Sequence, residues 1–279
     1  MLWRGRAGSS NIDDRRGMSG GGIAAGGGIG AIVIGILYFL LGGDPSQAPE
    51  LLPGQNRSTQ YSQQEKAADD TLAQFVGVVL KDTEDVWGRL LSNYRKPTLV
   101  LFRDGVQSGC GGASSASGPF YCPADEKVYI DLSFFQDLKT RFGAPGDFAM
   151  AYVIAHEVGH HIQNIMGTST KVRSLQQQSG EAEGNKLSVK LELQADFYAG
   201  VWAKHDQQLN NILERGDIEE ALTAANAIGD DRLQKESQGR VVPDAFTHGT
   251  SAQRMYWFKK GFETGDLRQG NTFEDPTLE

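Results

Sequence analysis

The feature that most constrains this chain is a histidine cluster inside one helical segment. Residues 151–167 read AYVIAHEVGHHIQNIMG, with apolar residues at helical spacing. His156 and His160 are four residues apart, so both imidazoles lie on one helix face and can reach a single metal ion. Glu157, the residue after His156, points slightly to one side of that face and can reach a water bound to the metal. The H-E-x-x-H spacing therefore predicts a Zn²⁺ site with Glu157 as the catalytic base, and a chance match is the alternative for this motif taken alone.

A catalytic zinc ion also needs a third protein ligand and an open position. Glu192, in the apolar helical run at residues 191–200, is the candidate third ligand. Asp196 follows one turn later on the same side and can accept a hydrogen bond from a ligand histidine. The alternative is a solvated acidic face, but the apolar neighbours predict burial, where unpaired carboxylates are costly. A metzincin site is excluded because Gln163 and Met166 stand where that motif needs glycine and a third histidine.

These two motifs resemble the H-E-x-x-H and E-x-x-A-D pattern of gluzincin peptidases, which include membrane-linked CAAX-type and heat-shock-type zinc proteases. Together with the N-terminal apolar segment, a cysteine loop and the run THGTSAQR, they are similar to the bacterial putative neutral zinc metallopeptidase family. The resemblance covers nearly all of the chain. It implies an α+β, zincin-like domain, mostly helical with a small sheet, that acts on a peptide or protein substrate.

The resemblance also implies roles for residues outside the metal ligands. In gluzincins a downstream histidine or similar donor stabilises the oxyanion, which makes His248 a candidate. Arg254 is expected to hold Asp196 or the substrate. The alternative for His248 and Arg254 is ordinary polarity at a helix start. His161 lies one residue off the metal face, so we expect it to contact a ligand or to pack beside the site.

The predicted reaction is peptide hydrolysis without a covalent intermediate, in which zinc acidifies a water and Glu157 moves its proton to the leaving amine. By analogy with zincins, the strand near residues 128–132 is expected to pair with an extended substrate. Two alternatives stay open. One is a membrane-anchored binding or scaffold protein that keeps zinc without turnover, and the other is a zinc hydrolase acting on a non-peptide amide. Glu157 has no structural duty beside three ligands, which favours an enzyme.

The N-terminal part of the chain predicts a membrane anchor. Residues 1–22 are polar and contain arginines, whereas residues 23–43 carry no charge and have the length of one crossing, about 20 residues. Arginines before the segment and acids after it place the N-terminus in the cytoplasm. We expect a single-pass protein of the bacterial inner membrane with a periplasmic or extracellular catalytic domain. A cleaved signal peptide is the alternative.

The remaining sequence divides by composition. Residues 44–66, rich in proline, glutamine and serine, predict a linker; residues 67–264 form the predicted zinc domain, and residues 265–279 a flexible tail. Apolar spacing predicts helices over 71–91, 146–166, 187–205 and parts of 206–236, and strands within 97–102 and 127–135.

Cys110 and Cys122 stand in a Gly/Ser-rich stretch, too far apart for a C-x-x-C redox or zinc motif. They predict a disulfide if the domain is exported and free thiols if it is cytosolic, and the expected topology favours the disulfide. A net charge of −8 without a long basic run excludes a nucleic-acid partner, because phosphate binding needs clustered lysine and arginine.

Overall fold

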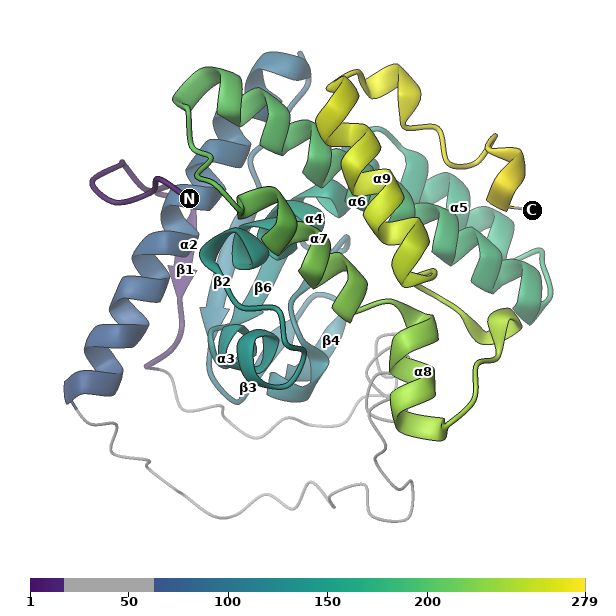
Figure 1. The fold of residues 1–279 in the computed structure, drawn as a ribbon, viewed down its shortest axis with the longest axis horizontal. Coiled ribbons are helices and arrows are strands. Elements are labelled where there is room, and N and C mark those ends of the chain that lie inside the picture. The colour runs from purple at the N-terminus through teal and green to yellow at the C-terminus, as the bar shows by residue number, and fades with distance from the viewer. Residues whose placement is uncertain (18–62, 279) are drawn as a thin grey trace.

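The structure is a computed structural model that describes residues 1–17 and 63–278, and it is mostly helical with a small sheet, as predicted (Figure 1). The helices are α2 (Gln63–Leu90), α3 (Ser133–Thr140), α4 (Asp147–Ile165), α5 (Thr168–Gln176), α6 (Glu181–Asn210), α7 (Asp217–Ala227), α8 (Asp230–Gln238) and α9 (Ser251–Thr264). The strands are β1 (Ile12–Asp14), β2 (Thr98–Phe102), β3 (Gly105–Ser108), β4 (Gly111–Ser114), β5 (Phe120–Cys122) and β6 (Lys127–Asp131).

The main sheet has the strand order β1-β2-β6-β5. The apolar strand β2 pairs in parallel with both β1 and β6, and β5 runs antiparallel to β6. Strand β6 was expected to receive a substrate, but β2 pairs along its whole length on one side, and β5 pairs with residues 127–129 on the other. Over those residues its hydrogen-bonding groups are already used, so the prediction is wrong there. Among the described residues, β5 is the edge strand on this side of the sheet.

Glycines permit close packing of the helices that carry the site. A Cβ atom on Gly159 of α4 would lie 3.0 Å from the backbone oxygen of Ala195 on α6. Helices α6 and α9 lie side by side (Figure 1). A Cβ on Gly200 would meet the backbone oxygen of Phe258 at 2.0 Å, and one on Gly261 would meet that of Phe197 at 2.1 Å. Neither contact leaves room for any side chain.

Residues 1–17 pack against the domain, which contradicts the prediction that a membrane separates the two. Strand β1 belongs to the main sheet, with Ile12 opposite Leu99. The backbone N–H of Leu2 donates to the carbonyl of Ile212 at 2.7 Å. The Met1 side chain is buried. Strands cannot pair through a bilayer, so an N-terminus in the cytoplasm is incompatible with this sheet when the domain lies outside.

The predicted anchor at 23–43 lies outside the described residues, as does most of the predicted linker. Among residues 1–17 and 63–278, no helix combines the length and apolar character that a bilayer crossing requires. Helix α2 begins at Gln63, four residues before the predicted start of the domain at residue 67.

The C-terminal segment 265–278 is packed rather than frayed. The side-chain amide of Gln194 on α6 donates to the carbonyl of Gly270 at 2.9 Å. The hydroxyl of the buried Thr272 donates to the carbonyl of Lys190 at 2.6 Å. These bonds satisfy polar groups of α6, so the expectation of a flexible tail was wrong for these residues.

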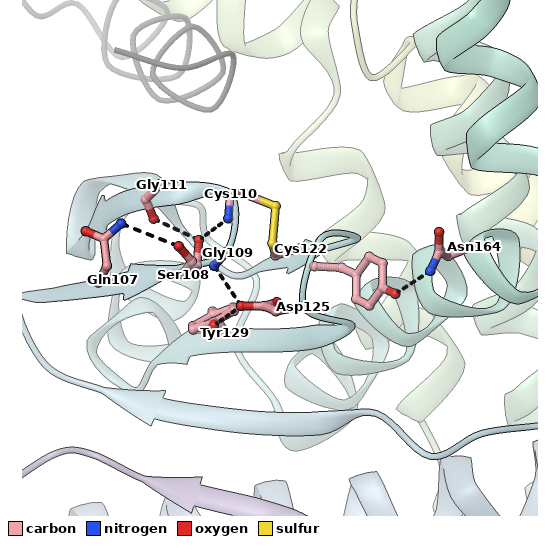
Figure 2. Close-up of a disulfide and its surroundings, with 10 residues drawn as sticks. Gln107, Ser108, Gly109, Cys110, Gly111, Cys122, Asp125, Tyr129 and Asn164 are labelled. Atoms are coloured by element: carbon pink, nitrogen blue, oxygen red, sulfur yellow. Dashed lines mark hydrogen bonds between the residues drawn. A yellow bond between two sulfur atoms is a disulfide. The ribbon is translucent and has the colours of Figure 1, made fainter. Parts of the chain in front are cut away.

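Cys110 and Cys122 form a disulfide, as predicted, with Cα atoms 5.8 Å apart. Cys110 lies in the turn between β3 and β4, and Cys122 ends β5, so the bond ties the small hairpin to the edge strand (Figure 2). The carboxylate of Asp125 reinforces the same region by accepting hydrogen bonds from the Gly109 backbone at 2.7 Å and from the Tyr129 hydroxyl at 2.6 Å. The edge strand is therefore held firmly at its C-terminal end.

Candidate metal centre

Two helices bring three potential metal ligands to one point. His156 and His160 lie on α4, and Glu192 lies on α6. The Nε2 atom of His156 is 3.1 Å from one carboxylate oxygen of Glu192, and Nε2 of His160 is 3.3 Å from the other. Tetrahedral zinc with bonds of about 2.0–2.2 Å holds its ligand atoms roughly 3.3–3.5 Å apart. The two histidine–glutamate spacings are close to this range, and all three side chains place a ligand atom within 4.8 Å of the others, so they form a candidate zinc site.

Gln163 fixes the orientation of His160. Its amide nitrogen donates to the Leu191 carbonyl at 2.7 Å, which settles which end of the amide is the oxygen. That oxygen lies 2.9 Å from Nδ1 of His160. Because an amide oxygen only accepts, Nδ1 of His160 carries the proton and Nε2 is left for a metal.

Asp196 holds His156 in the same way. One of its carboxylate oxygens lies 2.8 Å from Nδ1 of His156 and also accepts from the Tyr152 hydroxyl at 2.5 Å. Arg254 of α9 donates to both oxygens, from Nε at 2.8 Å and from Nη2 at 3.0 Å. The carboxylate and the guanidinium are almost fully buried, so each compensates the charge of the other. Of the two roles predicted for Arg254, the structure therefore shows the contact with Asp196.

The electrostatics of the cluster suit a bound cation. Burial alone would lower the pKa of His156, but the charge and hydrogen bond of Asp196, with the hydrogen bond to Glu192, raise it to about 10. Burial alone would raise the pKa of Glu192, yet the charge of His160 and hydrogen bonds from both histidines hold it well below its usual range. Without a metal, protons therefore provide the positive charge that these carboxylates require.

Glu157 lies beside the ligands in a cavity of about 390 Å³. The carboxylate belongs to the helix that carries both histidines, and the residue is buried. Residues 117–121 and Pro123 line one wall of the cavity and belong to β5 and its flanks. Side chains of α5 line another part, and further lining residues come from segments that precede α4 or follow α7, including Phe134, Phe142, Ile228, Leu233 and His248.

His248 also lines this cavity and is fixed by Asp230. One Asp230 oxygen lies 3.1 Å from Nδ1 of His248, and the other accepts three backbone N–H groups, those of residues 247–249. Burial alone would lower the pKa of His248, but the charge of Asp230 outweighs it and raises that pKa. Asp230 thus favours the cationic form of His248, and within the described residues no hydrogen bond engages its Nε2 atom.

A comparison with protein families gives a match over most of the chain. The family described as "Putative neutral zinc metallopeptidase" matches residues 1–273. The chain belongs to this family. The match includes both residues 1–17 and the helices that carry the candidate ligands, so the whole described fold lies within it except its last few residues.

Relatives of the chain include bacterial proteins of similar length. The chain is 51% identical over 284 aligned positions to the Escherichia coli K12 protein named "Uncharacterized protein YpfJ", covering 98% of this chain and 99% of that protein. It is 46% identical over 203 positions to the Mycobacterium tuberculosis H37Rv protein named "Uncharacterized protein Rv2575", covering 69% of this chain and 68% of that protein. No solved structure matches the chain significantly.

His161 packs away from the three ligands. Its Nε2 lies 2.6 Å from the backbone oxygen of Arg95, which only accepts, so Nδ1 must accept from the Tyr121 hydroxyl at 3.0 Å. Asn164 donates to the same hydroxyl at 3.1 Å, the bond drawn at Asn164 in Figure 2. Burial lowers the pKa of His161. Of the two expectations for this residue, packing is the one seen, and it ties β5 to α4.

Two residues of the site were not predicted. Gln163 was considered only as a reason to exclude a metzincin, although its position three residues after His160 places it on the same helix face. Asp230 stands 18 residues before His248, and nothing in the local sequence pairs them. The chain must fold before that pair is visible.

Proposed function

We propose that this protein is a zinc-dependent peptidase in which Glu157 is the catalytic base. The observation that carries the proposal is the spacing of 3.1 and 3.3 Å between the histidine Nε2 atoms and the Glu192 oxygens, beside a cavity that Glu157 also lines. His156, His160 and Glu192 would hold the ion. When bound, zinc supplies a Lewis acid that polarises a carbonyl and acidifies water.

The residues around the ligands supply the remaining steps. Glu157 accepts the proton of the attacking water and delivers it to the amide nitrogen that leaves. His248, kept cationic by Asp230, donates a hydrogen bond to the oxygen that becomes negative when the carbonyl is attacked. Asp196 with Arg254 keeps His156 in the orientation and tautomer that a metal ligand needs.

An edge strand beside the cavity favours a peptide over a small amide. Strand β5 pairs with β6 on one side, and among the described residues no strand pairs with its other edge. Residues of β5 and the turn before it line the cavity. An extended peptide laid along this edge would gain backbone hydrogen bonds independent of its sequence, as in other strand-addition complexes.

We also propose that the domain works outside the cytoplasm. The Cys110–Cys122 disulfide supports this location, because such bonds persist in oxidising compartments and are rare in the cytosol.

The proposal is tested with the full chain purified in detergent, because a chain truncated near residue 60 would lack β1. Zinc content and cleavage of casein or a peptide library are compared for the wild type, Glu157→Gln and, as a matched control, Glu181→Gln at the exposed start of α6. We expect all three to bind one zinc ion and only Glu157→Gln to be inactive.

Three results would count against the proposal in different ways. Zinc binding without cleavage by any form supports the scaffold alternative. Full activity of Glu157→Gln would remove Glu157 as the base. A wild-type chain that binds no zinc would remove the metal site itself.

A further inference from the structure

The N-terminal segment, residues 1–17, completes the sheet of the zinc domain. Strand β1 pairs with β2 over Ile12–Asp14, and backbone bonds continue on both sides of that pairing. The Leu99 N–H donates to the Asn11 carbonyl at 2.9 Å, and the Arg15 N–H donates to the Leu101 carbonyl at 2.8 Å. Without this segment, the outer edge of β2 would expose unpaired backbone groups on a buried apolar strand.

Two buried acids of α2 depend on the same segment. Arg6 binds Asp82 through two hydrogen bonds of 2.7 and 2.5 Å, and the Asp82 side chain is only 3% exposed. The Glu84 carboxylate accepts from the Ser9 hydroxyl at 2.6 Å and from the Asn11 amide at 2.7 Å, in addition to its ion pair with Lys96. Removing the partner of a buried carboxylate is strongly destabilising, so these contacts are part of the folded domain.

The two chain segments also meet at their backbones. A Cβ atom built on Gly8 would lie 3.7 Å from the Cα of Gly77 on α2, and the Ser9 N–H donates to the Gly77 carbonyl at 2.9 Å. Trp3 packs edge-to-face on Phe75 with ring centroids 5.4 Å apart. The interface therefore combines backbone, charged and aromatic contacts.

We infer that residues 1–17 and the zinc domain fold as one unit on one side of the membrane. If the chain crossed the membrane once between residue 17 and the domain, a hydrocarbon layer about 30 Å thick would separate the partners of every contact described above. The uncharged sequence from Ile23 to Leu41 is about one crossing in length, which is too short for two helical crossings. The disulfide of the domain, Cys110–Cys122, assigns this common side to the oxidising compartment.

The test uses the full chain in intact cells and a cysteine pair, Gly8→Cys with Gly77→Cys. The matched control pairs Gly8→Cys with Gly88→Cys, which lies on the same helix roughly 16 Å further along. We expect an intrachain disulfide in the first pair after mild oxidation, seen as a mobility shift that a reductant reverses, and none in the control. Both native cysteines are already paired with each other, so they do not compete.

A second variant covers the case in which the cysteine pair disturbs folding. Gly17→Cys lies at an exposed position where a Cβ meets nothing within 4 Å. We expect a membrane-impermeant maleimide to label it in cells whose outer membrane alone is permeabilised. Labelling of Gly17→Cys only after full lysis, together with no intrachain disulfide in the first pair, would overturn the inference. A covalent dimer in place of the intrachain bond would also count against it.

Discussion

The carboxylate of Asp230 holds His248 by both its ring and its backbone. One oxygen faces Nδ1 of the ring at 3.1 Å, and the other accepts the His248 N–H at 2.6 Å. A histidine in a loop is thereby fixed relative to the helix that follows Gly229, and its raised pKa keeps it protonated to a higher pH. If His248 acts on the oxyanion, Asp230 sets both its position and its charge.

Asp230→Asn is therefore expected to shift the pH profile of kcat. Without the negative charge the pKa of His248 falls, so the cation is lost at lower pH and the alkaline limb moves toward neutrality. A fall of one pKa unit would cost about tenfold in kcat on that limb. Peptide hydrolysis measured across pH tests this, with exposed Asp244→Asn as the control. A uniform loss of activity with an unmoved limb would show that Asp230 is only structural.

Zinc affinity is expected to rise with pH. In the metal-free chain, Asp196 and Glu192 raise the pKa of His156 to about 10, so a proton occupies this ligand at neutral pH. The metal must displace that proton, and each displaced proton makes the apparent affinity rise about tenfold per pH unit. Competition with a chelator between about pH 6 and about pH 8 measures the slope. An affinity independent of pH would mean that the ligands are already deprotonated.

Tyr121→Phe is expected to weaken substrate binding while leaving zinc content unchanged. The phenol hydroxyl donates to His161 and accepts from Asn164, so its loss leaves two polar groups of α4 without their partner on β5. For the buried His161 such a loss costs about 1–3 kcal/mol, and the edge strand loosens beside the cavity. We expect KM to rise more than kcat falls. Tyr256→Phe, at an exposed position, is the control; equal kinetics for both variants would contradict this role.

Asp206→Asn is expected to reduce the loss of folding stability at alkaline pH. Burial and the charge of Asp206 raise the pKa of Asp82, and burial also raises the pKa of Asp206. The folded Asp82–Asp206 pair thus keeps one proton that the unfolded chain releases near pH 4, so stability falls as the pH rises above that value. The Tm of the wild type should drop from about pH 5 to about pH 8.5, and the variant should drop less. Asp137→Asn, at an exposed position of α3, is the control; parallel curves for wild type and Asp206→Asn would refute the explanation.

The three candidate metal ligands could be brought together from the sequence because their geometry is local or nearly so. His156 and His160 share a helix face through their spacing alone, and the apolar surroundings of Glu192 indicated a buried carboxylate that needs a cation. The Asp196 contact followed from one helical turn. Asp230 was not predictable, since it meets His248 only after α8 and the loop that follows it have folded.

The N-terminus shows a different limit of sequence reasoning. Charge bias around an apolar segment correctly describes many membrane proteins, but it takes no account of whether the flanks bind each other. Ile12–Asp14 is too short to be recognised as a strand, and its pairing with β2 is parallel and distant in sequence. Arg6 counted as a positive charge for topology, whereas it is the partner of buried Asp82.

Substitution of the glycines between α6 and α9 is expected to disturb the candidate zinc site. Backbone atoms of the facing helix lie so close to Gly200 and Gly261 that neither position has room for a side chain. This close approach of α6 and α9 brings Arg254 within hydrogen-bonding distance of Asp196. A methyl group at either glycine would force the helices apart and carry the guanidinium away from the carboxylate that orients His156. The coordination geometry of the candidate zinc is thus governed partly by two residues that touch neither the metal nor its ligands, and damage there would appear first as weakened metal retention.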